Sequence, residues 1–242
     1  MKGILLFIAC CLFTAAYGQG SGRALSFDGT RVTPGSPEAT IPAGVRINRS
    51  FFNQRAQYTW EAWVFPTDPL YCHLFTEGNP LTTFAISLIN GQVILATWNQ
   101  GTPGNWTGVG TATGLVPNNH WTHVAISMNS GTVRIYINGS LADEFLNVPG
   151  QNNGATALAS VGINTGFASQ PDQPFSGRLD ELRIWDRALT QDEIRHKMTE
   201  RLAGAEPGLL AYYRLDEGAD NTCPGGQDVC DASGNGNHAV KF

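Results

Sequence analysis

The sequence predicts an all-β fold, a sandwich of two antiparallel sheets, from three features of its pattern and composition. Short apolar or alternating segments recur along the chain and are separated by turns rich in Gly, Asn, Asp and Pro, as in sandwich proteins. Charged residues make up only 14% of the 242 residues, against roughly 25% in an average domain. A single segment has the pattern of a helix, and strands do not alternate with helices, which excludes a parallel α/β fold.

Two hairpins carry the clearest strand signals. Residues 84–89 and 92–98 flank Asn90-Gly91, and residues 121–128 and 133–137 flank a turn at 129–131. Two-residue turns of the Asn-Gly type match the twist of paired strands. Further strands are expected at residues 23–27, 58–65, 177–185 and 208–214.

A short helix is expected near residues 191–202. Thr190 and Glu193 have the spacing of a capping box, which marks a helix start. After them, Ile194, Met198 and Leu202 recur every fourth residue and would form one apolar face.

The beginning of the chain predicts export. Residues 1–18 combine a positive start, an apolar run at residues 4–16 and small residues before Gln19, the pattern of a secretory signal peptide rather than a membrane span. Residues 19–242 are expected to form a single sandwich domain that is secreted. Residues 208–242 would supply its C-terminal strand and a tail rich in Gly, Asn and Asp.

The net charge limits the classes of partner, and the cysteines indicate the redox compartment. The formal net charge is −5 and no run of five Lys or Arg occurs, which argues against a nucleic-acid partner. Cys223 and Cys230 enclose a short Pro-Gly-Gly loop and predict a local disulfide in an oxidising compartment, with metal binding as the alternative. Cys72 is then either a buried thiol or a link to another chain.

Six motifs follow one another in a fixed order. They are ALSFDG at 24–29, TWEAWV at 59–64, WTHVA at 121–125, IYING at 135–139, FSGRLDELRI at 175–184 and RALTQDEI at 187–194. In this order they resemble the laminin-G-like domains of the concanavalin-A-like lectin/glucanase superfamily. The resemblance implies a two-sheet antiparallel jelly roll. Pentraxins share that fold, but their His-x-Cys signature is missing here.

The C-terminal segment departs from the order of that family. GLLAYYRLDEG at 208–218 and DASGNGN at 231–237 stand at the end of this chain, whereas the first of them usually precedes the Phe-Asp-Gly motif. Either the terminal strand completes its own sandwich, which we favour, or it opens a second repeat that ends before completion.

The resemblance also implies a calcium ion near the rim of the sandwich. Calcium takes oxygen ligands from carboxylates and carbonyls, and Asp28 and Asp180 match positions that look like ligands in relatives. Without an ion, Asp28 would bond its own backbone in a turn, and Asp180 would pair with a neighbouring arginine.

An exposed tryptophan would suit sugar binding, because its flat apolar face can stack on a pyranose ring. Trp98 and Trp106 flank a loop rich in Asn and Gly. Trp98 is expected to point inward, so Trp106 is the better candidate, with Asn99 and Asn105 as polar neighbours. Glycosylation sequons, which in an exported chain would be accessible, begin at Asn48, Asn105 and Asn138.

Catalysis is not expected. A retaining glycosidase needs two carboxylates about 5–5.5 Å apart, and Glu61, Asp180 and Glu181 lack an acidic partner at suitable spacing along their strands. We therefore expect a secreted, non-enzymatic module that binds an extracellular glycan or a matrix or cell-surface protein with calcium. The alternatives are a matrix assembly protein that self-associates through Cys72 or the terminal strand, and, less favoured, a glycan-cleaving enzyme.

Overall fold

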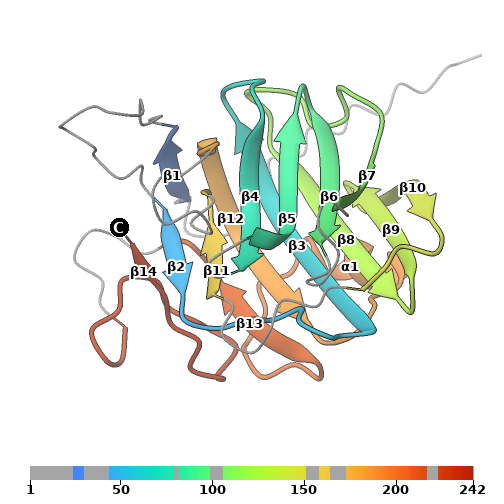
Figure 1. Ribbon diagram of the computed structural model, residues 1–242. Helices are drawn as coiled ribbons and strands as arrows, with labels where there is room; N and C mark the ends of the chain where they lie inside the picture. The colour runs from blue at the N-terminus through green and yellow to red at the C-terminus, as the bar shows by residue number, and fades with distance from the viewer. Residues whose placement is uncertain are drawn as a thin grey trace, which may run out of the picture.

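Figure 1 shows a computed structural model of the chain. The structure describes residues 24–29, 44–78, 82–98, 106–150, 158–163, 173–216 and 223–241. Two antiparallel sheets face each other, so the predicted sandwich is confirmed. The expected signal peptide at residues 1–18 lies outside the described residues.

Each sheet is built from strands that are distant in sequence. Sheet A has the order β1-β12-β3-β8-β9-β10, and β13 also pairs with β12; sheet B has the order β14-β2-β11-β4-β5-β6-β7. The strands of sheet A are β1 (Leu25–Asp28), β3 (Gln57–Pro66), β8 (Thr122–Asn129), β9 (Thr132–Ile137), β10 (Ser140–Phe145), β12 (Ser176–Trp185) and β13 (Leu209–Tyr213). Those of sheet B are β2 (Val45–Ile47), β4 (Cys72–Gly78), β5 (Thr82–Ile89), β6 (Gln92–Trp98), β7 (Trp106–Gly110), β11 (Leu158–Val161) and β14 (Val240–Lys241).

The main core lies between the sheets and follows from strand alternation. On β3, Trp60 and Val64 belong to this core and are fully buried. They face aromatic side chains of the opposite sheet, and the ring centroids of Trp60 and Phe75 are 6.5 Å apart. Because successive side chains point to opposite faces of a strand, Glu61 and Trp63 lie on the outer face of sheet A.

The hairpin turns agree with the prediction. Asn90, Ser130 and Asn138 have φ values of 49°, 47° and 50°, and a Gly with positive φ follows each of them. This pattern is that of the type I′ turn, whose twist matches paired strands. A side chain at Gly91 would place its Cβ 2.7 Å from the carbonyl oxygen of Val116, so that glycine also permits a close backbone approach.

A β-bulge in β12 was not predicted. The pairing of β12 with β3 shifts between Asp180 and Arg183, and Glu181 has a φ of 52°. The extra residue lets Leu179 and Leu182, three positions apart, both reach the inner core. In a regular strand the two would face opposite sides. The bulge also separates two neighbours along one edge, because β1 pairs with β12 up to Leu179 and β13 pairs with it from Leu182.

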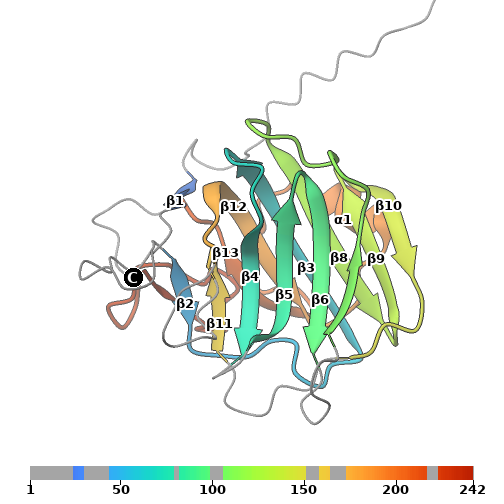
Figure 2. The same ribbon diagram turned by 45° about the horizontal axis from the view of Figure 1, so that its top comes forward.

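A second, smaller apolar cluster covers the outer face of sheet A where β12 ends. It joins side chains of β8, β9, β12 and β13 to Leu189, Ile194 and Leu202. The helix α1 (Gln191–Lys197) lies against this side of the sheet, behind β8 and β9 in Figure 2. None of the described helical residues forms a segment long and apolar enough to span a bilayer.

The helix begins where predicted and ends earlier. Thr190 and Glu193 form both bonds of the capping box. The helix ends at Lys197 rather than near Leu202, because the next carbonyl groups turn toward side chains of sheet A. Those side chains are Arg183 and Trp63.

The C-terminal strand completes its own sandwich, as favoured from the sequence. Tyr213 lies opposite Leu182 in sheet A, and Val240 of β14 lies opposite Arg46 in sheet B. The segment between these two strands contains a short loop that the Cys223–Cys230 disulfide closes. Residues 209–241 therefore contribute to both sheets of one sandwich.

Asp231 fixes this tail to β13. Its Oδ1 accepts hydrogen bonds from the backbone N–H groups of Tyr212 (3.0 Å) and Ser233 (2.9 Å). Its Oδ2 accepts from the Asn237 N–H at 2.9 Å. Three backbone donors thus depend on a single buried carboxylate.

Replacing Asp231 with alanine should destabilise the whole sandwich. The buried N–H groups of Tyr212 and Ser233 would lose their acceptor, and each such loss costs about 1–3 kcal/mol. We expect the free energy of unfolding in urea to fall by about 2–4 kcal/mol. Asp192→Ala is the matched control, since its side chain is 96% exposed, and it should change stability by less than about 0.5 kcal/mol. Equal stability of the two variants would show that the tail is an appendage.

Candidate functional site

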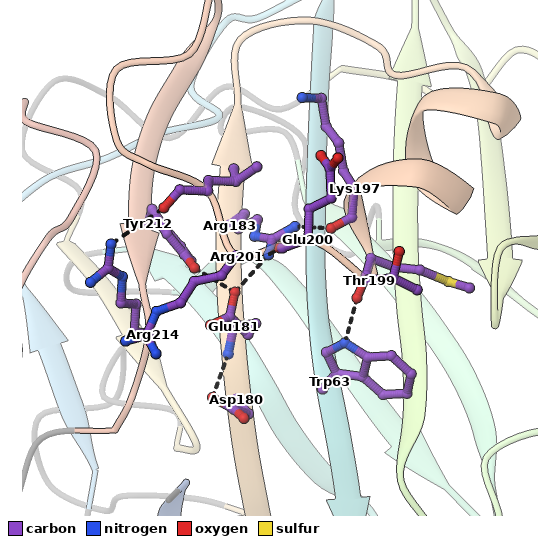
Figure 3. Close-up of polar contacts among 12 residues, drawn as sticks. Trp63, Asp180, Glu181, Arg183, Lys197, Thr199, Glu200, Arg201, Tyr212 and Arg214 are labelled. Carbon is purple, nitrogen blue, oxygen red and sulfur yellow. Dashed lines mark hydrogen bonds and ion pairs between the residues drawn. The ribbon is translucent and has the colours of Figure 1, made fainter. Parts of the chain in front are cut away.

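A buried charged cluster lies on the outer face of sheet A beneath α1 (Figure 3). Its centre is Arg183 of β12, which is 1% exposed. The Nη2 atom of Arg183 donates to Glu181 Oε2 at 2.6 Å, and Nη1 lies 3.7 Å from Glu61 Oε1. The Tyr212 hydroxyl of β13 also donates to Glu181. Strands β3, β12 and β13 are therefore linked by one set of polar contacts.

The same guanidinium holds the segment that follows α1. Arg183 donates to the carbonyl oxygens of Lys197 and Glu200, both at 2.5 Å. Trp63 Nε1 donates to the carbonyl of Met198 at 3.0 Å. The last carbonyls of a helix have no partner within it, so Arg183 and Trp63 cap α1 from the sheet below. This explains why the helix is shorter than predicted.

Burial controls the protonation of this cluster. Burial raises the pKa of Glu61, although Arg183 opposes the effect. Burial and the nearby Arg183 lower the pKa of His123 to about 3, so His123 is neutral at neutral pH. Burial and the neighbouring Glu181 raise the pKa of Asp180 to about 7.

The cluster has the character of a structural anchor. Glu61 is 0% exposed, and its Oε1 accepts from Trp185 Nε1 at 3.0 Å. Glu181 is occupied by Arg183 and Tyr212. A glycosidase acid needs access to a glycosidic oxygen, and both carboxylates are buried, although Glu61 Oε2 and Glu181 Oε1 have no hydrogen-bond donor among the described residues. The sequence did not predict the cluster, because its members lie on three strands. The charged residues within the apolar motifs TWEAWV and DELRI were the only indication of buried polar groups there.

The structure does not bring the two predicted calcium ligands together. Asp28 is exposed and lies opposite Ser176 in the β1–β12 ladder. Asp180 is four residues farther along β12, about 13 Å at the ordinary rise of a strand. Asp180 is buried, and its Oδ1 accepts from the Glu181 N–H at 2.9 Å. Among the described residues, no three His, Cys, Asp or Glu side chains are arranged to hold a metal, and calcium binding stays a prediction.

The predicted sugar platform is only partly described. Trp98 and Trp106 are cross-strand partners in the β6–β7 hairpin, but their side chains, like Asn99 and Asn105, lie outside the described residues. An open pocket of about 470 Å³ lies near this hairpin. Thr97 Oγ1 donates to the Pro149 carbonyl at 3.4 Å, and the pocket is lined by Gln54, Arg55, Ala56, Met128, Ser130, Gly131, Val148 and Gly150.

The other end of the outer face of sheet A is not covered by α1. Here Phe65 of β3, Trp121 beside β8 and Arg178 of β12 are all half-buried. The ring centroids of Phe65 and Trp121 are 5.4 Å apart. Arg178 Cζ lies 4.0 Å from the Phe65 centroid and 5.3 Å from that of Trp121. We call these three residues the aromatic–arginine patch; neither the platform prediction nor the calcium prediction included them.

The predicted cysteines and two of the three sequon asparagines lie in the part of the chain that the structure describes. The Cys223–Cys230 disulfide is confirmed, and Cys72 is a buried thiol on β4, 3% exposed. Of the sequon asparagines, Asn48 and Asn138 are exposed, and Asn105 is outside the described residues. Asn138 Oδ1 accepts from the His123 N–H at 2.9 Å. Glycosylation stays a prediction.

Known proteins provide a comparison for this geometry. A family profile described as "Concanavalin A-like lectin/glucanases superfamily" matches residues 38–195. A rat protein with sushi, von Willebrand factor type A, EGF and pentraxin domains is 28% identical over 127 residues, which cover 49% of this chain and 3% of that protein.

Two solved structures share the fold. Domain 4 of AbnA, an extracellular arabinanase from Geobacillus stearothermophilus, was solved with arabinotriose; it matches with a TM-score of 0.53 and 28% identity, over 66% of this chain and 73% of that one. A Bacteroides ovatus protein named as a candidate carbohydrate binding protein matches with a TM-score of 0.60 and 20% identity, over 82% of this chain and 57% of its own.

Replacing Arg183 with lysine should destabilise the protein although the charge is kept. An ammonium group cannot reach Glu181 and two carbonyl oxygens with the geometry of a guanidinium. Disrupting a buried ion pair costs about 3–5 kcal/mol, and we expect a loss near the lower value in urea unfolding. Arg134→Lys is the control on the same sheet, where Arg134 is 39% exposed and pairs with Glu144. If the lysine variants were equally stable, the anchoring role would be wrong.

Asp180 should make stability depend on pH in a defined direction. Its pKa is near 4 in the unfolded chain and about 7 in the folded one, so the folded state holds an extra proton between these values. The stabilisation is full below pH 4 and is lost as the pH rises to 7. Asp180→Asn avoids this loss, so its stability relative to the unmodified protein should rise by about 2–4 kcal/mol between pH 4 and pH 8.

The control for this measurement is Asp192→Asn at the exposed start of α1. Its unfolding curve should stay parallel to that of the unmodified protein over the same pH range. A parallel curve for Asp180→Asn as well would contradict the raised pKa of Asp180.

Proposed function

Because this chain belongs to the concanavalin A-like lectin/glucanase superfamily, we propose that it is a secreted, non-enzymatic module that binds glycans. The observation that carries the proposal is the open pocket of about 470 Å³ beside the β6–β7 hairpin. Sugar-sized ligands occupy pockets of roughly 300–1,000 Å³. Domain 4 of AbnA, which has a similar fold, was solved in complex with arabinotriose. This supports a carbohydrate ligand for the present chain.

The lining of the pocket suits an oligosaccharide. Gln54, Arg55 and Ser130 offer polar groups, whereas Met128 and Val148 offer apolar surface. Sugars present both hydroxyl groups and apolar ring faces, so a mixed lining of this kind matches them. The Thr97–Pro149 hydrogen bond joins the end of β6 to the segment that lines the pocket.

We propose that Trp106 supplies the stacking surface at this end of the sandwich, with Asn99 and Asn105 as hydrogen-bonding neighbours. Trp106 follows the loop that begins just beyond Thr97, and an indole ring can cover one face of a pyranose.

Calcium dependence is part of the proposal. Asp28 is exposed at the end of β1 and carries the oxygen chemistry that calcium prefers. Asp180 would join such a site only if the β12 bulge rearranged, since its carboxylate bonds the Glu181 N–H. Export is supported by the signal-peptide pattern of residues 1–18 and by the Cys223–Cys230 disulfide.

The features that suggested matrix assembly are used within the chain. Cys72 is buried, so its thiol does not face a neighbouring molecule. β13 pairs with β12 of its own chain. Glycan binding therefore has more support than assembly through these two features.

A glycan array with calcium and with EDTA tests the proposal. We expect specific binding that EDTA weakens by lowering the stability of the sandwich, because Asp28 lies opposite Ser176, at the other end of the sheet from the pocket. Trp106→Ala should lower affinity for the bound glycan by about tenfold. A stacking contact with an aromatic ring contributes up to about 1.5 kcal/mol, and tenfold in affinity corresponds to about 1.4 kcal/mol. Leu146→Ala is the control, an apolar side chain 65% exposed beyond β10, and it should bind normally.

Two results would count against the proposal. Absence of binding to any glycan in both conditions would remove glycan recognition. Binding that EDTA and Trp106→Ala both leave unchanged would keep glycan recognition but reject this site and its calcium ion.

A further inference from the structure

The aromatic–arginine patch stands apart from the pocket described above. It lies on the outer face of sheet A at the end where β3 finishes and β12 begins. The pocket lies at the opposite end, beside the turn between β8 and β9. The two surfaces can therefore bind independently.

Arg178 differs from its neighbours in its contacts. Five other described arginines pair with carboxylates: Arg134, Arg183, Arg187, Arg195 and Arg201. For Arg178 the recorded contacts are with the rings of Phe65 and Trp121. Within the described part of the chain, no carboxylate forms an ion pair with its guanidinium.

Ring contacts orient a guanidinium without using its hydrogen bonds. A cation–π contact involves the flat face of the group, whereas its five N–H donors lie in the plane. Contact with both rings reduces the rotamer freedom of Arg178 that a ligand would otherwise have to restrict. A planar fork fixed in this way matches the two oxygens of a carboxylate.

Asp28, Asp68 and Asp180 are acidic residues near the patch, and none of them forms an ion pair with Arg178. Arg178 reaches from β12 across Phe65 of β3, whereas Asp28 is on β1, on the other side of β12. Asp180 shares the outer face, but it is buried and its Oδ1 accepts the Glu181 N–H. Among the described residues, the guanidinium of Arg178 thus has no ion-pair partner, in a chain whose net charge is −5.

Sugar-binding chemistry is present around the cation. The Trp121 ring provides an apolar surface of the kind on which pyranose rings stack. Thr67 and Ser176 place two hydroxyl groups 2.8 Å apart at the edge of the same face. Since Ser176 and Arg178 are two residues apart on β12, both point to this side of the sheet.

We infer that this patch is a second binding site, specific for a sugar that carries a carboxylate. Arg178 binds the carboxylate with two parallel hydrogen bonds, and Trp121 supports the pyranose ring. The site needs no calcium, because the anion is neutralised by a guanidinium. It does not depend on the pocket beside the β6–β7 hairpin.

Affinity measurements with defined oligosaccharides test the inference. The acidic probes are a hyaluronan hexasaccharide, which carries glucuronate, and 3′-sialyllactose; the neutral probes are chitohexaose and lactose. We expect at least one acidic probe to bind tenfold or more tightly than its neutral partner, in EDTA and with affinity falling as salt rises. Preference for glucuronate or for sialate identifies the source of the carboxylate.

Substitutions then locate the site. Arg178→Gln should remove the preference for the acidic probe, and Arg178→Lys should recover only part of it, since an ammonium group lacks the planar fork. Arg134→Gln is the matched control: it removes the same charge from the same sheet at a position paired with Glu144. Its affinity should stay within twofold.

A measurement on the unmodified protein covers the case in which a variant does not fold. The indole N–H resonance of Trp121, assigned with Trp121→Phe, should shift on titration with the acidic probe and not with the neutral one. Equal affinities for acidic and neutral probes would overturn the inference. So would equal effects of Arg178→Gln and Arg134→Gln, complete loss of acidic binding in EDTA, or an unmoved Trp121 resonance. Loss of the Trp106-dependent binding alone would reject the proposed pocket and leave this site standing.

Discussion

The helix α1 and the segment that follows it are held on sheet A by one buried guanidinium, that of Arg183. A seven-residue helix such as α1 is too short to be stable by itself in water. Arg183 supplies what the helix lacks, because it donates to the carbonyl of Lys197, the last helical residue, and to that of Glu200 after the helix, while bonding Glu181 on its own strand. The contact is reciprocal. Arg183 can be buried only where acceptors surround it, and those acceptors come from the segment that it holds.

The same arrangement divides the outer face of sheet A into a closed and an open part. Trp63 donates to Met198 just after the helix ends, and Phe65, two residues farther along β3, is already half-buried. If α1 had continued to Leu202 as a helix, the carbonyls bound by Arg183 would have pointed along the helix axis instead. The early end of the helix and the open aromatic surface thus have a common cause in the capping contacts.

The sequence predicted the features that depend on neighbouring residues. The Asn-Gly turns, the capping box at Thr190 and the short Cys223–Cys230 loop are local, and the structure confirms them. It did not predict β4, because Cys72–Gly78 is buried on both faces and shows no alternation. The charged cluster was missed for a related reason, since Glu61 and Arg183 meet only through strand pairing. Asp28 and Asp180 illustrate the converse, because matching motifs placed them in one site while the register keeps them apart.

Closure of the sandwich by its last strands also determines when the fold can form. Arg46 of β2 pairs with Val240. Residues that follow Gly208 form β13, which pairs with the edge of β12 from Leu182 onward. During synthesis these residues leave the ribosome long after the strands that need them. Until then, both sheets have unpaired edges, and contacts between such distant residues form slowly. Until residues 208–241 have been made, the early strands must be kept from pairing with those of other nascent chains.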